Sequence, residues 1–297
     1  MSSVVIAGAG QRGLICAGEL AAAGTDVVVV ERLPHPGGQE PERSTARLAK
    51  AALRAGARFV LGTLAVQYDG TVVDVLGVDG AGSLPCGALV VATGSRPATR
   101  GELGITGDRC AGVVPGSAAL HLTQAGVLLG HRPLVAGSGA FAAHCAHVQL
   151  AAGASEVTMT LPARAAGVVR VPTGVRVFAG YRVASVHGNS RVEAAVLHRE
   201  SGPSEGEGEP RRPEGQSLTG DGEPQRIAVD ALILAAGMQP MRNIEGAITE
   251  RDGVFFCQSE GEDRGEQRAS TAAAATCSLV LAALAVGQSS VRSAGMT

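Results

Sequence analysis

Apolar residues in the first part of the chain fall into two short continuous runs, residues 4–7 and 27–30, which are separated by a longer Ala-rich segment. Continuous apolar runs of this length predict strands that are buried on both faces, as in a parallel sheet. The Ala-rich segment has the apolar periodicity of a helix and follows a glycine-rich turn. The pattern therefore predicts a strand, a helix and a second, parallel strand.

The same kinds of pattern continue along the chain and predict an α/β fold. A helix is expected over 41–55, after the turn-rich residues 33–39, and further helices are expected up to residue 152 and over 270–284. Further strands are expected at 58–64, 71–76, 88–92, 133–136, 156–160 and 231–235, with short alternating strands over 174–197. Residues 201–225 contain almost no apolar side chains, so we expect a flexible loop there.

Two sequence patterns each occur twice in the chain. An apolar run that ends in glycine and then proline occupies residues 88–97 and again 231–240. A strand that enters a glycine turn occupies residues 4–13 and again 133–142. A buried strand that stops at a glycine lies with its end at the carboxyl edge of a parallel sheet, which is where such sheets bind ligands. The repeats therefore predict two similar α/β folds.

The first glycine turn meets the separate demands of dinucleotide binding with separate residues. Gly8 permits a tight turn, Gly10 lets the backbone approach a pyrophosphate, and Gly13 lets the helix pack close to the strand. The helix N-terminus then offers unbonded N–H groups to phosphates. Glu31, eighteen residues after Gly13, stands where a carboxylate can bind a ribose. Because the chain holds 42 glycines, the glycine triplet gains its weight from this complete context.

The second glycine turn has Gly137, Gly139 and, at its third position, Ala142. Thr160 and Leu161 stand where the first fold has its acid. Arg164 lies just beyond and could meet a 2′-phosphate, which would favour NADP over NAD. The alternative is that this second fold holds no nucleotide and serves as scaffold. The sequence leaves both interpretations open, as it does for the pair Gly37-Gly38, which is either a plain loop or a bend around a cofactor.

The composition of the chain limits which binding partners and which cellular compartment we expect. A formal charge of −2, two tyrosines, five phenylalanines and no tryptophan argue against a nucleic-acid-binding surface. The six cysteines have no C-x-x-C pair, so we expect buried thiols in a reducing compartment. No basic leader is apparent at the N-terminus, and no apolar run approaches the ~20 residues that a membrane span requires. The expected location is the cytoplasm.

Side chains that could carry catalysis by themselves are not evident. Lys50 is the only lysine and lies outside any P-loop pattern. His144 and His147 have the spacing of two metal ligands but lack a third, so no metal site is expected. Cys145 adjoins His144, yet neighbouring helical residues point in different directions. No G-x-S-x-G elbow occurs. These observations favour chemistry that belongs to a bound cofactor.

These phrases together resemble the two-dinucleotide-fold flavoproteins related to the pyridine nucleotide-disulfide oxidoreductases. Residues 94–113 and 130–139 look most similar to the FAD subunits found with glycerol-3-phosphate, opine, proline and cyanide-forming dehydrogenases. The resemblance implies a Rossmann-like FAD-binding domain with an inserted second Rossmann-like domain of NAD(P) type. It implies an FAD-binding domain at 1–105 and 237–297 and an NAD(P)-type domain at 106–236.

The resemblance also implies which residues lie at the cofactors. The cofactor-binding residues expected on this basis are Gly8, Ala9, Gly10, Gln11, Arg12, Gly13, Glu31, Arg32, Gly38, Gln39, Ala65, Ala92, Thr93 and Gly94 for FAD, and Gly137 and Gly139 in the second fold. The chain departs from the family in lacking the redox cysteine pair and in having shortened segments after Gly38 and Thr160. It also has Gln258-Ser-Glu-Gly-Glu where a flavin-binding Gly-Asp is expected, so that Glu260 or Glu262 substitutes or FAD binding is weakened.

The function expected from the resemblance is that of an FAD-dependent oxidoreductase, or of the FAD subunit of a multi-subunit dehydrogenase. It would transfer hydride or electrons between a small organic substrate or NAD(P)H and an acceptor. The alternative is a non-catalytic structural subunit whose degenerate dinucleotide folds dock partner subunits. The missing second acid and the lost Gly-Asp motivate this alternative.

Overall fold

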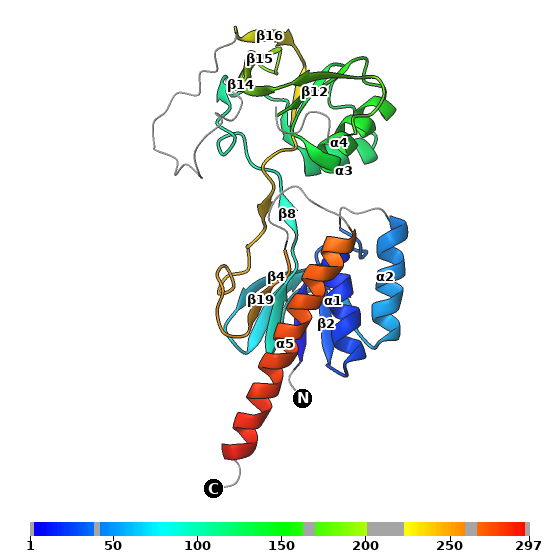
Figure 1. Ribbon diagram of the computed structural model, residues 1–297, viewed down its shortest axis with the longest axis vertical. Helices are drawn as coiled ribbons and strands as arrows, with labels where there is room; N and C mark the ends of the chain where they lie inside the picture. Colours follow the sequence, from blue (N-terminus) through cyan, green and yellow to red (C-terminus); the bar gives the residue numbers. More distant parts are fainter. Residues whose placement is uncertain (1–2, 39–41, 163–169, 201–222, 259–265, 295–297) are drawn as a thin grey trace, which may run out of the picture. The chain divides into compact units, whose positions relative to one another are not determined.

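The chain forms two compact units in the computed structural model, which describes residues 3–38, 42–162, 170–200, 223–258 and 266–294 (Figure 1). The first unit contains the described residues up to Ser95 and those from Pro240 onward, and the second contains residues 96–239. The chain therefore leaves the first unit, folds the second, and returns. The crossings are marked by two short strands that pair with each other, β8 (Ser95–Arg96) and β18 (Gln239–Pro240).

The first crossing comes earlier than the expected domain boundary at 105. Residues 96–105 fold with the second unit, because Ile105 is buried in the core of that unit and the Ala98 amide donates a hydrogen bond to the Ala236 carbonyl oxygen at 3.0 Å. The second crossing, at Pro240, comes slightly after the expected boundary at 236.

The first unit is built on a five-stranded parallel sheet with the strand order β19-β7-β1-β2-β3. Its strands are β1 (Val4–Ala7), β2 (Val27–Glu31), β3 (Arg58–Leu61), β7 (Ala88–Val91) and β19 (Val254–Phe256). Its helices are α1 (Gln11–Ala22), α2 (Glu42–Arg54) and α5 (Glu266–Ala294). An antiparallel sheet adds β4 (Thr63–Tyr68), β5 (Val72–Gly77) and β6 (Gly80–Pro85).

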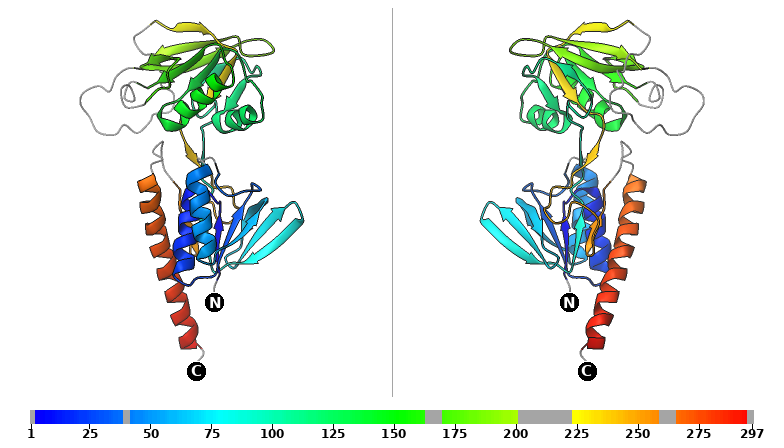
Figure 2. Two further views of the ribbon diagram at one scale, coloured as in Figure 1. Left: turned by 90° about the vertical axis from the view of Figure 1, so that its right-hand side faces the viewer. Right: turned by 90° about the vertical axis from the view of Figure 1, so that its left-hand side faces the viewer.

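Alternate residues of the central strands build two separate cores. The helices α1, α2 and α5 lie on one side of the central strands and the β4–β6 sheet on the other (Figure 2). Ile6 and Val29 belong to the core on the helix side, whereas Val5 and Val30 belong to the core shared with the β4–β6 sheet. All of these side chains are fully or nearly fully buried. Because side chains alternate across a strand, a strand covered on both faces must be apolar at every position. This is why the sequence shows continuous apolar runs.

The second unit repeats this plan with the strand order β10-β17-β11-β12-β13. Its parallel strands are β10 (Val113–Pro115), β11 (Pro133–Ala136), β12 (Val157–Leu161), β13 (Val175–Ala179) and β17 (Ala231–Leu234). One core packs this sheet against α3 (Gly116–Gln124) and α4 (Gly139–Ala151). The other packs it against a sheet of β9 (Thr106–Gly107), β14 (Tyr181–His187), β15 (Ala194–Arg199) and β16 (Gln225–Ala228).

The predicted α/β fold class, with two Rossmann-like units, is confirmed by these sheets. The helices and strands expected from the sequence form at or close to the expected residues, with two differences. The strand expected at 58–64 is divided at Gly62 into β3 and β4, which belong to different sheets, and α5 extends beyond its expected end at 284. The loop expected at 201–225 lies almost wholly outside the described residues, since 201–222 are not described and Gln225 already begins β16.

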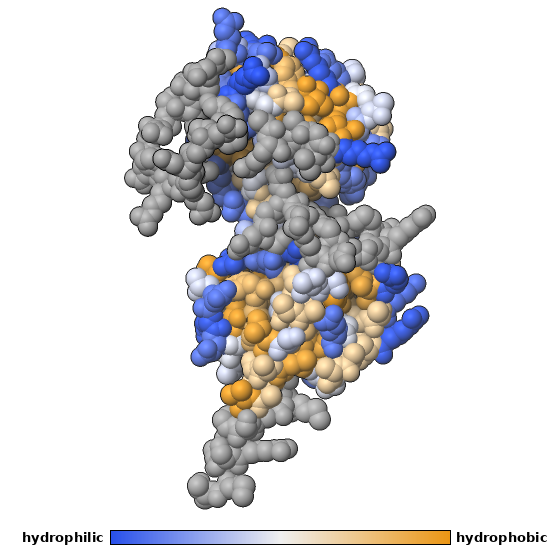
Figure 3. Space-filling view, viewed as in Figure 1, coloured by the Kyte–Doolittle hydropathy of each residue, from blue (hydrophilic) through white to orange (hydrophobic). Residues whose placement is uncertain are grey.

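Helix α5 is more apolar than expected. By length and composition alone, its segment Ala269–Val286 could cross a membrane, although only 28% of this segment is buried. Its buried residues form one stripe that faces the core: Ala269, Ala273, Thr276, Cys277 and Val280. Leu279 and Val286 remain 62% and 70% exposed, and hydrophobic surface covers this side of the first unit (Figure 3). The expected absence of a membrane span thus stays a prediction.

Candidate cofactor site

The turn between β1 and α1 is shaped by two glycines that no other residue could replace without movement. Gly8 has a φ of 108°, and a Cβ on it would collide with the backbone carbonyl of Ala92, at the end of β7. A Cβ on Gly13 would collide with the Gly8 carbonyl oxygen. Both glycines therefore let backbone segments approach more closely than a side chain permits.

Gly10 has a different role, because its surroundings are open. Its backbone is extended, with a φ of −72° and a ψ of 179°, and a Cβ placed on it would meet no atom within 4 Å. Helix α1 begins immediately afterwards at Gln11, without a side-chain hydrogen bond to cap it. The first amides of a helix lack partners inside the helix. The turn thus offers open space beside N–H groups and the positive end of the helix dipole.

Glu31 ends β2 and is the buried acid of this site, with 6% of its surface exposed. Its Oε2 accepts a hydrogen bond from the Ala9 amide at 2.8 Å, and its Oε1 accepts one from the Leu33 amide at 2.9 Å. The carboxylate therefore holds the glycine turn in place. Each of its oxygens can accept a further hydrogen bond, so a ribose hydroxyl is not excluded by these contacts.

A cleft opens next to this turn, with a free volume of about 390 Å³ that includes the part open to solvent. It is lined by Ala7, Gly8, Val30, Glu31, Arg32, Thr63, Leu64, Ala65, Thr93, Met241 and Asn243. Gly8, Glu31, Arg32, Ala65 and Thr93 are residues that the sequence predicted, and the structure brings them together from separate strands. Thr63, Leu64, Met241 and Asn243 were missed; no local pattern marks them, since only the folded sheet brings them to the cleft.

The Gly37-Gly38 pair lies directly against the glycine turn. The Gly37 amide donates a hydrogen bond to the Ala9 carbonyl oxygen at 2.8 Å. Gly38 has a φ of 62°, and a Cβ on it would lie 3.5 Å from the Gly10 Cα. The pair therefore forms a bend that packs against the glycine turn, and it is not a plain loop without contacts. Gln39, which was predicted to contact the cofactor, lies outside the described residues.

A polar network links the end of β7 with the two returning segments of the same unit. The Gln258 Nε2 donates hydrogen bonds to the Thr93 Oγ1 at 2.8 Å and to the Met241 carbonyl oxygen at 2.7 Å. The Thr93 hydroxyl also contacts the Met241 carbonyl oxygen, and the Met241 amide bonds the Gly94 carbonyl oxygen at 2.9 Å. Sequence reasoning missed Gln258 and pointed to Glu260 or Glu262, which lie outside the described residues.

Gln258 also carries a buried polar atom without a protein partner. Among the described residues, its Oε1 is buried and makes no hydrogen bond. A buried acceptor without a partner is costly, so such atoms point to a ligand, an ion or a water. The remaining predicted residues lie around the turn: Ala9 and Ala92 are buried, Gln11 and Arg12 begin α1 half-buried, and Gly94 is exposed.

The second glycine turn shares the structural part of this arrangement. Gly137 has a φ of 151°, and a Cβ on it would collide with the Ala235 carbonyl, just as Gly8 meets Ala92. Gly139 begins α4. In the sheet register Ala136 pairs with Thr160, so Leu161 takes the place that Glu31 has in the first unit. Leu161 is buried and apolar. Arg164 lies outside the described residues.

The histidine pair and the cysteines in the described part of the chain do not line the cleft of the first unit. His144 and His147 are both exposed on α4, and no group of three or more potential ligands comes together among the described residues. Five of the six cysteines are buried, as expected, and Cys110 is half-buried. Burial raises the pKa of the Cys86 thiol to about 11.

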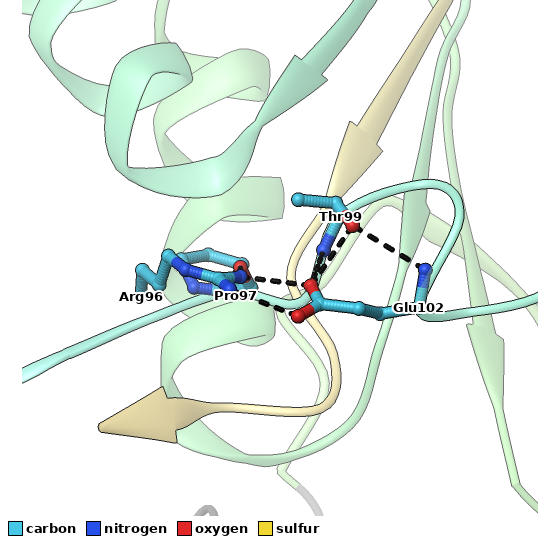
Figure 4. Close-up of polar contacts among 4 residues, drawn as sticks. All are labelled: Arg96, Pro97, Thr99 and Glu102. Carbon is cyan, nitrogen blue, oxygen red and sulfur yellow. Dashed lines mark hydrogen bonds and ion pairs between the residues drawn. The ribbon is translucent and has the colours of Figure 1, made fainter. Parts of the chain in front are cut away.

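A charged cluster follows the first crossing (Figure 4). Glu102 forms two hydrogen bonds with the Arg96 guanidinium, at 2.8 and 2.9 Å, and also accepts the Thr99 amide at 2.7 Å. The Glu102 amide in turn bonds the Thr99 hydroxyl at 3.3 Å, which completes a capping box. The Arg96 guanidinium and the Thr99 amide hold the pKa of the Glu102 carboxyl well below its usual range. This cluster fixes the start of the second unit.

Comparison with known proteins agrees with this geometry. Residues 1–115, which include β1, the glycine turn, Glu31 and β7, match the profile of the family described as pyridine nucleotide-disulphide oxidoreductase. Residues 1–115 are thus similar in sequence to that family. No curated protein sequence matches the chain significantly.

Solved structures with a similar fold cover both units. Thioredoxin reductase from Lactococcus lactis is similar with a TM-score of 0.65 at 15% identity, over 96% of this chain and 99% of that one. An NAD-dependent persulfide reductase from A. fulgidus gives a TM-score of 0.58 at 17% identity, over 91% of this chain and 57% of that one. L-proline dehydrogenase from P. horikoshii gives 0.56 at 16% identity, over 96% and 56%. At these identities the likeness shows the fold alone.

Proposed function

We propose that this chain is an FAD-dependent oxidoreductase, or the FAD subunit of a multi-subunit dehydrogenase. It transfers hydride or electrons between a small organic substrate or NAD(P)H and an acceptor. The family match over residues 1–115 supports an oxidoreductase. The choice of FAD rests on the site in the first unit, and the choice of substrate class rests on the resemblance to small-molecule dehydrogenases.

The residues present fit the dinucleotide half of FAD. The open space at Gly10 and the uncapped start of α1 suit a pyrophosphate, which needs N–H donors and no side chain in the way. Glu31 lies at the same turn and can bind a ribose. The unpartnered Oε1 of Gln258 fits a hydroxyl or N–H group of a ligand at the carboxyl edge of the sheet.

The cofactor, when bound, would supply the electron-transfer chemistry, and the protein's residues would hold and orient it. Gly8 and Gly13 keep the turn tight, and the amides at the start of α1 would donate hydrogen bonds to the pyrophosphate. Glu31 holds the turn through the Ala9 amide and orients the ribose. Gln258 fixes Thr93 and Met241 at the edge of the cleft. No side chain of the described cleft is assigned a proton-transfer role.

The observation that carries the proposal is the empty volume at Gly10 beside an uncapped helix. The test is a titration of the purified chain with FAD, followed by flavin absorbance and fluorescence after gel filtration. Gly10→Ala should leave folding unchanged, since its Cβ meets no protein atom. It should weaken FAD binding about tenfold or more, equivalent to ~1.4 kcal/mol, because the methyl group occupies the path of the pyrophosphate.

Gly101→Ala is the matched control, because Gly101 also has open space around it and lies in the second unit. It should bind FAD like the unaltered chain. A protein that stays colourless after FAD is added, in both the unaltered chain and the control, would overturn the proposal.

A second candidate function is that of a non-catalytic subunit whose dinucleotide folds dock partner chains. Two observations favour it: Leu161 replaces the acid in the second unit, and the exposed face of α5 carries Leu279 and Val286. Reduction of bound flavin by NADPH or NADH in the isolated chain would count against this candidate. It would also support an occupied NAD(P) site in the second unit, whose NADP preference through Arg164 remains a prediction.

A further inference from the structure

Three buried cysteines that are far apart in the sequence come together in the helix-side core of the first unit. Cys16 lies on α1, Cys257 follows β19, and Cys277 lies on α5. Their exposed fractions are 0%, 2% and 4%. Cys86, Cys110 and Cys145 belong to other cores. No C-x-x-C spacing links these cysteines, so no sequence pattern indicates the cluster.

Two of these thiols are in direct contact. The Cys16 Sγ lies 3.6 Å from the Cys257 Sγ. A disulfide bond is about 2.05 Å long, so bond formation requires each sulfur to move by less than ~1 Å, which small side-chain rotations can supply. Cys277 is placed differently, because its Sγ is directed at the Cys16 carbonyl oxygen, at 3.9 Å. Cys277 also interacts with the Cys16 thiol, and the Sγ–Sγ contact of 3.6 Å marks Cys16 and Cys257 as the pair to oxidise.

The environment gives the two thiols unequal roles. The hydrogen bond from the Cys16 thiol lowers the pKa of Cys257. Burial opposes this shift, whereas the Thr276 hydroxyl and the Arg12 charge add to it, and the net direction is downward. The same Cys16–Cys257 bond raises the pKa of Cys16. Since the thiolate is the nucleophile in thiol chemistry, Cys257 is the attacking sulfur and Cys16 the resolving one.

We propose that Cys16 and Cys257 form an oxidisable dithiol that a peroxide or a small-molecule disulfide converts to a disulfide bond. With hydrogen peroxide, the Cys257 thiolate attacks an oxygen, the O–O bond breaks, and a sulfenic acid and hydroxide form. The Cys16 thiol then attacks the sulfenic sulfur, and water leaves as the S–S bond forms. In total, two thiols and one peroxide give one disulfide and two waters.

The bond would join two parts of the first unit that meet at the glycine turn and the sheet edge. Cys16 lies on the helix whose N-terminus follows Gly10, and Cys257 precedes Gln258, which holds Thr93 and Met241. Burial of both sulfurs means that oxidation requires local opening of the α1–α5 packing, so it should be slow in the folded protein. The inference does not depend on flavin binding.

Peptide mapping of the full chain tests the proposal. The reduced protein is treated with hydrogen peroxide or with glutathione disulfide, its remaining thiols are alkylated, and it is digested with trypsin without reduction. Cleavage after arginine places Cys16, Cys257 and Cys277 on separate peptides, 13–32, 252–264 and 269–292. The expected product is 13–32 joined to 252–264, ~2 Da lighter than the two reduced peptides together. It should be released by dithiothreitol.

Two outcomes would overturn the proposal. One is a cross-link between 13–32 and 269–292 in place of the expected one. The other is full alkylation of Cys16 and Cys257 after Cys110, which is the more exposed thiol, has been oxidised.

Variants give a second measurement. Oxidation should raise the Tm of the unaltered chain by about 5–10 °C, because the cross-link closes a loop of 241 residues. Cys277→Ala, the matched control from the same cluster, should keep this shift. Cys16→Ala should lose it, and equal shifts in both variants would refute the pairing. If Cys16→Ala does not fold, the peptide map of the unaltered chain decides alone.

Discussion

The two units of the chain are built on the same sheet but differ at the point where a dinucleotide would bind. In the first unit the strand order β19-β7-β1-β2-β3 surrounds the glycine turn after β1. In the second, β10-β17-β11-β12-β13 surrounds the turn after β11 in the same way. In each unit the first glycine of the turn lies against a backbone carbonyl at the end of the neighbouring strand. Gly8 lies against Ala92, which follows β7, and Gly137 lies against Ala235, which follows β17.

The difference lies in the residues that would contact a ligand. Glu31 accepts the Ala9 amide in the first unit, while Leu161 takes the corresponding place in the second. The third glycine, Gly13, is replaced by the buried Ala142. The close strand-to-turn packing is therefore kept in both units, whereas the buried acid is kept in one. A glycine turn alone indicates the fold, and the acid beside it indicates the ligand.

The largest expected effect comes from breaking the feature that both units share. Gly8→Ala and Gly137→Ala should each destabilise their unit by roughly 2–5 kcal/mol, because the new Cβ strains a positive φ and collides with a backbone carbonyl. Chemical denaturation followed by circular dichroism measures the loss.

Matched controls exist in each unit. Gly24 and Gly153 also have positive φ values, 84° and 98°, but a Cβ on either would meet no atom within 4 Å. Gly24→Ala and Gly153→Ala should cost only the conformational strain, about 1–2 kcal/mol. If the turn variants are no less stable than these controls, the close approach to the return strand does not constrain the turn.

Much of this shared feature was predictable because its requirements are local. A continuous apolar run, a glycine turn and a helical apolar period follow one another within a few residues. A buried parallel strand that leads into a packed helix requires all three. Glu31 was predictable by its distance from Gly13. The strand β6 was not, since Gly80–Pro85 has little strand propensity and forms through pairing with β5 at an exposed edge.

The rest of the site could not be predicted because its contacts cross the chain. Gln258 bonds Thr93 and Met241, which lie on two segments separated by the entire second unit. No spacing rule connects such positions. The contact of Cys16 with Cys257 has the same origin, since the sheet brings the start and the end of the chain into one core.

The next effect comes from making the first unit resemble the second. Glu31→Leu removes the acceptor of the Ala9 and Leu33 amides and any hydrogen bond to a ribose. We expect FAD binding to weaken by about 1.5–3 kcal/mol, roughly 10- to 150-fold in Kd, as measured by fluorescence titration. Glu19→Leu is the control, because Glu19 is an exposed acid on α1 that does not line the cleft. If Glu31→Leu and Glu19→Leu lost the same FAD affinity, the loss would come from the change in overall charge and not from a contact of Glu31 with the cofactor.

The smallest expected effect on stability concerns the two places where the chain passes between the units. There, Arg96 in β8 and Gln239 in β18 each stand before a proline. Glu102→Gln breaks the ion pair with Arg96 and weakens the capping box. Both side chains are 41% exposed, so we expect the Tm to fall by no more than a few degrees at pH 7.

The pH dependence of the Tm difference between the unaltered chain and Glu102→Gln shows whether the charge of Glu102 causes that difference. Because the folded pKa of Glu102 is depressed, its contribution is present above the unfolded value of about 4.3 and is lost as the pH falls through the folded value. The Tm difference between the unaltered chain and Glu102→Gln should therefore shrink as the pH is lowered below ~4. Glu156→Gln removes a charge that pairs with Arg176 at 3.3 Å in the same unit and serves as the control. A Tm difference for Glu102→Gln that stays constant down to pH ~2 would show that the capping geometry, and not the charge, fixes the start of the second unit.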